Sequence, residues 1–415
     1  MISHAELAAE FGTPLYVYDL DELAAARDEL FAALPEEFEL FYALKANPHP
    51  GIVRELRTGA RSCRAEISST GELTAALAAG FTGADCLYTG PGKTAGELAE
   101  AIGHGVRLFS TDSVTDVRRV GAVATAHGVV ADCLLRVNSV TASAATSIRM
   151  TGVPSQFGFD SETLIELLPA LREVPGTRLA GMHFFPLSNA DEASLIGEFQ
   201  HTIATAAELA AAAELPLRYL DIGGGFAAPY GVPGERGAYP TLRGELAVAL
   251  DKYLPSWRAG RPQIACESGR FLVGASGTLV TQVSNVKISR GRKFVIADAG
   301  INTFGGMSGL GRLLPVAVGL APDSRGEQAS LVGPLCTPGD VLGRHIALPP
   351  VEPGDLLSVP NTGAYGPTAS LLMFLGRPAP MEVLVRGDRV VSASRIDYRR
   401  VEHVLPAKFE STEGI

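Results

Sequence analysis

The sequence predicts an α/β protein that combines a TIM (β/α)8 barrel with a C-terminal all-β domain. Strand-like and helix-like runs alternate eight times between about residues 22 and 270, at the intervals of βα units. Beyond residue 270, short β-rich runs separated by Gly and Pro replace the helical periodicity. The 415 residues are 46% hydrophobic and 19% charged, which is enough apolar material for a large core. A doubly wound open sheet is the alternative architecture for the alternating part.

Short apolar runs predict the barrel strands, and amphipathic stretches predict the helices between them. The strands are expected near residues 39–44, 62–66, 85–88, 106–109, 131–137, 178–184, 217–222 and 262–266. The helices are expected at 20–34, 50–59, 70–79, 94–103, 114–127, 161–172, 192–213 and 241–258. In such a barrel the active-site groups gather at the carboxyl ends of the strands.

The remaining segments predict a β-domain that is built from both ends of the chain. Strands are expected at 271–273, 277–283, 294–296, 356–359 and 381–385, with one helical stretch around 368–375. A short helix and the β-like run at 15–18 precede the barrel, so this run is expected to pair with the C-terminal strands. The predicted boundaries are therefore 22–270 for the barrel, 1–21 with 271–405 for the β-domain, and 406–415 for a loose tail.

Composition excludes several function classes. The net charge of −10 and the lack of a basic run argue against nucleic-acid binding. Five cysteines in an odd, widely spaced set without a CxxC motif predict neither disulfides nor a metal site, and favour a reducing cytoplasm. The N-terminus has no signal-peptide pattern, and no apolar stretch is long enough to predict a membrane span.

Lys45 is the first candidate catalytic residue. It ends the apolar run Phe41–Leu44, and Asn47-Pro48 then stops the run, which predicts a buried strand leading into a turn. Burial there would lower the pKa of the ammonium and make the amine available to form a Schiff base. The alternative is a lysine at a strand end whose ammonium reaches water.

Two further motifs follow predicted barrel strands. Gly223, Gly224 and Gly225 come directly after Asp221-Ile222, and consecutive glycines let the backbone approach an anion such as phosphate. Glu267, Gly269 and Arg270 follow the last strand and would suit a ligand that carries both a ring nitrogen and a phosphate. The alternatives are a tight turn for the glycines and an exposed ion pair for Glu267 and Arg270.

Two loops of the predicted β-domain also carry reactive groups. Cys336 stands in the Gly/Pro loop 333–340, where a thiol can act as an acid or a nucleophile. The other four cysteines are interpreted as inert core residues. Tyr365 lies among glycines in the run 361–366, where its hydroxyl could reach an anion.

Together these motifs resemble the alanine-racemase-like-fold pyridoxal-phosphate decarboxylases, the group of diaminopimelate, ornithine and arginine decarboxylases. The resemblance covers about residues 12–400. It is based on Tyr-Ala-Leu-Lys-Ala-Asn (42–47), Asp-Ile-Gly-Gly-Gly-Phe (221–226), Glu-Ser-Gly-Arg (267–270), Gly-Pro-Leu-Cys (333–336) and Gly-Ala-Tyr-Gly (363–366). The segments 65–73 and 89–93 also belong to it. It implies the cofactor pyridoxal 5'-phosphate and an obligate homodimer with active sites at the interface.

The resemblance implies a role for each matching position. Lys45 corresponds to the lysine that forms the Schiff base with the cofactor, and Glu267 to the carboxylate that pairs with the pyridine nitrogen. Cys336 corresponds to a cysteine that reaches over from the partner subunit to protonate the carbanion. Arg136 corresponds to a strand-end arginine near the cofactor. The phosphate-binding set comprises Ser188, Gly223, Gly224, Gly225, Gly269, Arg270 and Tyr365.

One departure from the family pattern affects the expected cofactor contacts. Phe185 stands where the family usually has a histidine that stacks on the cofactor ring, and Leu187-Ser188-Asn189 replaces Gly-Ser-Gly or Gly-Ser-Gln. Phe185 can still stack but cannot donate a hydrogen bond. His183 is interpreted as a hydrogen-bonded core residue, because one strand step is expected to turn its side chain away from the face of Phe185.

Other departures affect the substrate. Thr337 follows Cys336 where relatives that act on basic amino acids have an acidic residue, so a buried substrate ammonium would lack a counter-charge. The glycine-rich loop 301–312 looks closer to members from antibiotic and siderophore pathways, which act on acylated or carrier-tethered amino acids. Arg312, Thr337 and Asp340 are the candidate substrate-binding residues.

The resulting hypothesis is a homodimeric, pyridoxal-phosphate-dependent decarboxylase of a conjugated amino acid. Three alternatives stay open at this point. They are a diaminopimelate decarboxylase, an amino-acid racemase of the same fold and a non-catalytic pyridoxal-phosphate-binding protein. Glu267 argues against the racemase, which usually has an arginine at the ring nitrogen.

Overall fold

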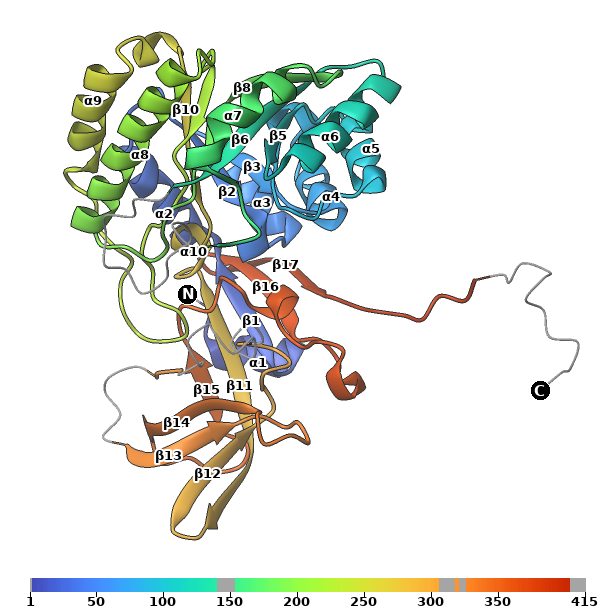
Figure 1. Ribbon diagram of the computed structural model, residues 1–415. Coiled ribbons are helices and arrows are strands. Elements are labelled where there is room, and N and C mark those ends of the chain that lie inside the picture. The colour runs from blue at the N-terminus through green and yellow to red at the C-terminus, as the bar shows by residue number, and fades with distance from the viewer. Residues whose placement is uncertain (1, 140–153, 306–317, 321–325, 404–415) are drawn as a thin grey trace, which may run out of the picture.

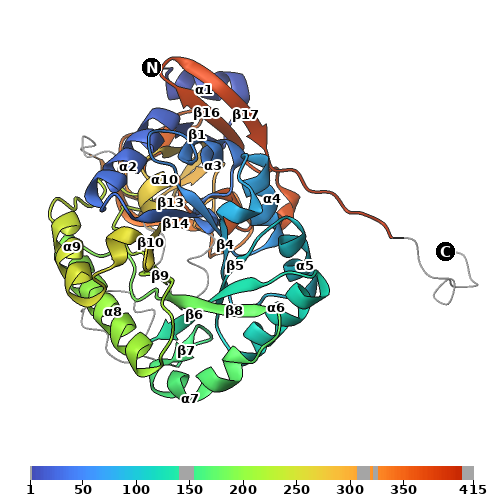
Figure 2. The same ribbon diagram turned by 90° about the horizontal axis from the view of Figure 1, so that it is seen from above.

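The structure is a computed structural model that describes residues 2–139, 154–305, 318–320 and 326–403. Eight parallel strands form the barrel (Figure 2). They are β2 (Glu39–Ala43), β3 (Arg64–Ile67), β4 (Cys86–Tyr88), β5 (Leu108–Thr111), β6 (Ala131–Asn138), β8 (Thr177–His183), β9 (Tyr219–Asp221) and β10 (Gln263–Ser268). A two-residue strand, β7 (Phe159–Asp160), pairs with the end of β6.

The pairing of β5 with β6 joins the two ends of this sheet. Leu108 to Thr111 pair in register with Asp132 to Leu135, and β10 pairs with β2 elsewhere in the ring. A closed ring of parallel strands is a barrel, so the predicted TIM barrel is confirmed and the doubly wound open sheet is wrong.

Helices cover the outside of the barrel in the predicted order (Figure 2). They are α2 (Leu20–Ala33), α3 (Pro50–Leu56), α4 (Thr70–Ala78), α5 (Ala95–Gly103), α6 (Val114–Ala126), α7 (Ser161–Arg172), α8 (Glu192–Ala212) and α9 (Leu242–Tyr253). Side-chain caps fix several of their starts. The hydroxyl of Ser69, for example, accepts from the Glu72 amide and begins α4 directly after β3.

A second sheet of eight strands forms the β-domain below the barrel in Figure 1. Its strands are β1 (Leu15–Asp19), β11 (Gly277–Ser289), β12 (Arg292–Ala297), β13 (Glu327–Val332), β14 (Val341–Leu348), β15 (Leu356–Val359), β16 (Met381–Arg386) and β17 (Arg389–Arg395). The N-terminal strand β1 lies between β11 and β16, as the sequence predicted. The N-terminal helix α1 (His4–Phe11) packs against β1.

Three details of the β-domain differ from the prediction. Phe271–Val273 belongs to the one-turn helix α10 (Arg270–Val273), because an apolar run this short fits a buried helical turn as well as a strand. The stretch 368–375 forms no long helix but two 3₁₀ turns, Pro367–Ala369 and Phe374–Gly376. Strands β13, β14 and β17 were not predicted, and β17 is exposed along its whole length. The predicted loose tail, 406–415, lies outside the described residues.

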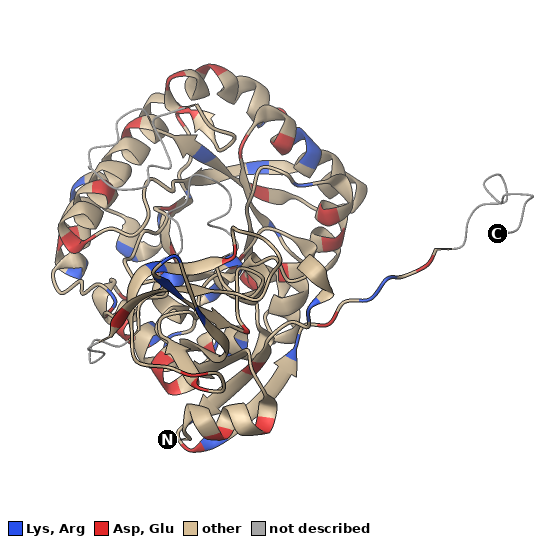
Figure 3. Cartoon of the chain, turned by 90° about the horizontal axis from the view of Figure 1, so that it is seen from below, with Lys and Arg blue, Asp and Glu red and all other residues tan. Residues whose placement is uncertain are grey.

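Acidic and basic residues are interspersed over the outer helices of the barrel (Figure 3). In the part of the chain that the structure describes, no helix combines the length and the apolar character that crossing a membrane requires.

Candidate active site

A pocket opens at the carboxyl ends of the barrel strands, where the barrel meets the β-domain. Its lining includes Lys45 after β2, Gly224 and Gly225 after β9, and Glu267 at the end of β10. The other lining residues are Ala43, Phe185, Ser188, Asn189, Phe226, Ser268, Gly269, Arg270 and Tyr365. The fold thus brings together residues that are up to 322 positions apart, and most of the predicted site residues are among them.

Lys45 lies in a 3₁₀ turn, Leu44–Ala46, which continues β2. Its side chain is 44% exposed and its Nζ lies 3.6 Å from the buried carboxylate of Glu66. Burial lowers the pKa of Lys45, but Glu66 and Glu267 outweigh this effect, so the pKa lies above its ordinary value. The expected lowered pKa is therefore wrong for this state of the protein. The two carboxylates favour the ammonium.

The β-domain is tied directly to the turn that carries Lys45. The Tyr365 amide donates to the Ala46 carbonyl at 2.7 Å, and the Asn47 side chain donates to the Gly363 carbonyl at 2.9 Å. Tyr365 adopts a left-handed backbone conformation with φ of 52°. Such a conformation costs energy for a residue with a Cβ, so these hydrogen bonds help to hold Tyr365 at the pocket.

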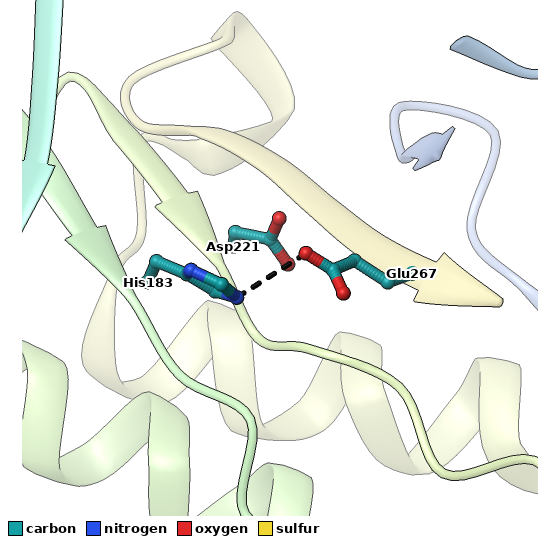
Figure 4. Close-up of side chains that lie close together, drawn as sticks. All are labelled: His183, Asp221 and Glu267. Carbon is teal, nitrogen blue, oxygen red and sulfur yellow. Dashed lines mark ion pairs between the residues drawn. The ribbon is translucent and has the colours of Figure 1, made fainter. Parts of the chain in front are cut away.

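Glu267 lies at the inner end of the pocket beside His183 and Asp221 (Figure 4). The His183 Nε2 is 3.2 Å from the Glu267 Oε1, and its Nδ1 is 2.6 Å from the Ser110 hydroxyl. Burial raises the pKa of Glu267, but His183, Lys45 and Arg136 outweigh it and hold this pKa below its ordinary value. Glu267 is thus an ionised carboxylate that faces the pocket.

The pKa of Asp221 is shifted in the opposite direction. Burial and the neighbouring Glu267 carboxylate raise its pKa well above the ordinary value, although the Gly223 amide donates to its Oδ1 at 2.8 Å. The surroundings thus shift the two pKa values apart, favouring the protonated form of Asp221 and the ionised form of Glu267. The ligand atoms of His183, Asp221 and Glu267 lie within 4.8 Å of one another, a spacing that a metal ion could also bridge. The raised pKa of Asp221 favours a proton on this carboxyl group over a cation between the two carboxylates.

Another part of the pocket lining suits an anion. Gly224, Gly225, Ser188 and Arg270 all line it, and the guanidinium of Arg270 lies 5.7 Å from the centroid of the Tyr365 ring. The fold itself also requires glycine at positions 224 and 225. A Cβ on Gly224 would lie 2.4 Å from the Glu267 carbonyl oxygen, and Gly225 has a φ of 125°. Gly223 is not among the lining residues.

Phe185 forms one wall of the pocket. Its ring centroid lies 5.3 Å from the Lys45 Nζ and 6.0 Å from the guanidinium carbon of Arg136. Arg136 is buried and lies 4.0 Å from Asp112, and Asp112 is also 3.9 Å from the buried ammonium of Lys93. The position of Arg136 is thus set by a buried charge network behind the pocket.

Other predicted residues are placed elsewhere. Cys336 is exposed and does not line this pocket in its own chain. Thr337 is half-buried in the same loop. The Asp340 carboxylate is buried and accepts from the amides of Ile301 and Leu335 at 2.8 and 2.6 Å. Both carboxylate oxygens of Asp340 thus bind backbone amides and stabilise the loop around Cys336. This role is structural and differs from the expected contact with the substrate. Arg312 lies outside the described residues.

Sequence reasoning missed three polar residues of the site. Glu66 contacts Lys45, and His183 and Asp221 surround Glu267. The sequence could have pointed to two of them, because Glu66 lies in the segment 65–73 that resembles the family and Asp221 is the first residue of the glycine motif. His183 is a buried, hydrogen-bonded residue as predicted, but one of its ring contacts is a carboxylate of the site itself.

The pocket fits pyridoxal phosphate. An amine at its mouth can react with an aldehyde, and glycines, Ser188 and Arg270 at one end can hold a phosphate. At the inner end, the Glu267 Oε1 is buried without a hydrogen-bond partner among the described residues. A protonated ring nitrogen would supply that partner.

Comparisons with known proteins agree with this geometry. The family described as pyridoxal-dependent decarboxylase, pyridoxal binding domain, matches residues 20–274. An L-glutamyl-[BtrI acyl-carrier protein] decarboxylase from Niallia circulans is 31% identical over 400 residues, which cover 93% of this chain and 92% of the relative. A diaminopimelate decarboxylase from Archaeoglobus fulgidus is 33% identical over 396 residues, with coverages of 92% and 90%. The solved structure of diaminopimelate decarboxylase from Helicobacter pylori with L-lysine has a TM-score of 0.79 at 27% identity and covers 94% of this chain and 95% of that one.

Proposed function

We propose that this chain acts on an amino acid within a larger conjugate. The chain belongs to the pyridoxal-dependent decarboxylase family and is a pyridoxal-phosphate-dependent amino-acid decarboxylase. The conjugate is an acylated or carrier-protein-tethered amino acid. The similarity to a decarboxylase of an acyl-carrier-protein substrate supports this choice.

The loop around Cys336 carries the proposal. Its carboxylate, Asp340, is buried and occupied by the Ile301 and Leu335 amides, and Thr337 offers only a hydroxyl. A free diamino acid carries a second ammonium, which is costly to bury without a counter-charge. A conjugated amino acid has no such ammonium, so this loop suits it better.

Each residue of the pocket has a proposed task. Lys45 binds the cofactor covalently, and the Glu66 carboxylate, 3.6 Å away, holds or accepts the proton at Nζ. Glu267 binds the ring nitrogen, while Ser188, the glycines and Arg270 bind the phosphate. The bound cofactor supplies an electron sink for the bond that loses carbon dioxide. The Phe185 ring forms an apolar wall that positions the ring and excludes water from one side.

The proton that replaces carbon dioxide is proposed to come from Cys336 of the partner subunit. In its own chain this thiol is exposed and away from the pocket lining. An apolar patch at Leu371, Met373, Phe374 and Leu375, with side chains that are 42–70% exposed, supports a face that a second copy covers. The working unit is therefore a homodimer in which each site takes one thiol from its neighbour.

A substrate panel tests the proposal. The purified protein with added pyridoxal phosphate is incubated with free amino acids and with pantetheine thioesters, including the glutamyl thioester, and mass spectrometry detects the loss of carbon dioxide. Turnover of at least one conjugate, with weak turnover of the matching free amino acid, is expected. Turnover confined to free amino acids would contradict the proposed substrate class.

Diaminopimelate decarboxylation is the second candidate, and the similarity to diaminopimelate decarboxylases favours it. The same panel includes free meso-diaminopimelate. Efficient release of lysine from this compound, with no turnover of conjugates, would establish this second candidate.

A further inference from the structure

A groove outside the cofactor pocket separates the barrel from the edge of the β-domain. It lies between helices α3 and α4 on one side and strands β16 and β17 on the other, and it has a volume of about 590 Å³. Much of its lining is apolar or small, including Pro50, Ala75 and Ala78. A volume of this size accommodates an elongated small molecule.

The groove is continuous with the surroundings of Lys45. A second cavity of about 460 Å³ is lined by Lys45, Ser69 and Glu72. The groove and this cavity share three lining residues, Pro48, Gly71 and Thr368, which form a neck between them. A chain that passes through the neck would have one end at the catalytic lysine and the other in the groove.

The part of the groove beyond the neck is suited to an anionic group. Arg54 and Arg395 both line it and are exposed, and no ion pair within the described residues engages either guanidinium. The acid in this lining, Glu382, is buried and accepts a hydrogen bond from the Tyr18 hydroxyl at 3.1 Å. The Arg54 guanidinium donates one hydrogen bond to the Ala78 carbonyl at 3.1 Å and keeps further N–H groups for a ligand. Two guanidiniums without an acidic partner among the described residues, in a protein of net charge −10, provide a local site for a phosphate.

We propose that this tether groove holds the linker of a conjugated substrate, a flexible amide-containing chain whose distal phosphate binds Arg54 and Arg395. This inference rests on the proposed function and specifies how its substrate class is recognised. The amino acid lies at Lys45, the linker passes Gly71 at the neck, and the carrier protein stays outside.

Gly71 offers a clean test, because it is the second residue of α4 and its missing Cβ points into open space. A Cβ there would meet only the Ser69 hydroxyl, at 3.7 Å. Gly96 is the matched control, since it is the second residue of α5 and a Cβ there would have no neighbour within 4 Å. Replacing either glycine by leucine favours the helix, so both variants should fold.

The experiment compares Gly71→Leu, Gly96→Leu and the parent protein, all loaded with pyridoxal phosphate. kcat/KM is measured for a phosphopantetheine thioester of the preferred amino acid and for the free amino acid. Gly71→Leu is expected to lower kcat/KM for the conjugate at least tenfold and to change that for the free amino acid less than twofold. Gly96→Leu should change neither.

The double variant Arg54→Gln with Arg395→Gln tests the phosphate end. It is expected to raise KM for the phosphopantetheine conjugate several-fold but not for the pantetheine conjugate without phosphate. Full activity of Gly71→Leu on a conjugate that the parent protein turns over would overturn the groove and leave the proposed function standing. A parent protein that turns over no conjugate would refute the proposed function itself.

Discussion

His183 lies against Glu267, the carboxylate that is proposed to bind the cofactor ring, and replacing His183 by leucine should weaken cofactor binding. Leucine has a similar volume but cannot bind either the Ser110 hydroxyl or the Glu267 Oε1, which His183 contacts at 2.6 and 3.2 Å. Without the imidazole, one of the groups that lower the pKa of Glu267 is lost, so this pKa should rise and the ionised form that pairs with the cofactor should be less favoured.

The magnitude follows from the contacts. The hydrogen bond that Glu267 is proposed to make with the ring nitrogen of the cofactor would contribute about 1.5–3 kcal/mol, so its loss corresponds to a decrease of about 10- to 160-fold in affinity for pyridoxal phosphate. Leaving the hydroxyl of Ser110 unpaired in the core costs a further ~1–3 kcal/mol of folding stability.

The assay is reconstitution of the cofactor-free protein, followed by the visible absorbance of the bound cofactor, with urea denaturation of the cofactor-free protein alongside. Ser110→Ala is the control, because it removes the outer hydrogen bond and leaves the contact between His183 and Glu267 in place. If His183→Leu lowered the stability but left the dissociation constant of pyridoxal phosphate within twofold, His183 would be only a core residue and the reasoning would be refuted.

The remaining predictions concern other groups. Lys45→Ala should abolish decarboxylation and the borohydride-sensitive visible absorbance, and a variant that kept both would exclude Lys45 as the anchor. Mixing inactive Lys45→Ala and Cys336→Ala proteins should restore about a quarter of the parent activity. Half of the dimers then contain one chain of each kind, and each such dimer has one intact site out of two. No recovery of activity would exclude sites that are shared between subunits. Burial raises the pKa of Glu382 to about 7 from 4.5, so the folded protein binds an extra proton between these values and loses stability as the pH rises through them. Glu382→Gln can still accept from Tyr18 and should recover up to about 3 kcal/mol at pH 8, measured by urea denaturation, whereas equal stabilities at pH 8 would contradict this. Zn²⁺ added to the cofactor-free protein should show no tight binding in a 1:1 ratio by calorimetry, and such binding would indicate a metal at the Glu267 cluster.

The barrel could be predicted from the sequence because its signals are local and repeated. Each strand is a short apolar run, each helix has its own amphipathic period, and the order of the two is fixed by the chain. The outer strands of the β-domain lack such a pattern. β17 is exposed on both faces, so nothing in its sequence marks it before its pairing with β16 is known.

The site was predictable where a motif supplies the chemistry and not where packing supplies it. Lys45, Glu267 and Arg270 stand in recognisable motifs and meet in one pocket. The raised pKa of Lys45 depends on Glu66, which is 21 residues away in sequence and belongs to the next strand. A rule based on burial alone therefore predicts the wrong direction for the pKa shift of Lys45.

The division of labour between the two sheets explains how one family can serve different substrates. The barrel supplies Lys45 and Glu267, whose proposed contacts are with the cofactor and not with the substrate side chain. The elements proposed to select the substrate, namely the Cys336 loop and one wall of the tether groove, come from the β-domain. Since the Tyr365 amide donates a hydrogen bond to the Ala46 carbonyl, the barrel and the β-domain are joined directly at the turn that carries Lys45. Substitutions in the β-domain loops can thus change the substrate while the cofactor chemistry stays intact.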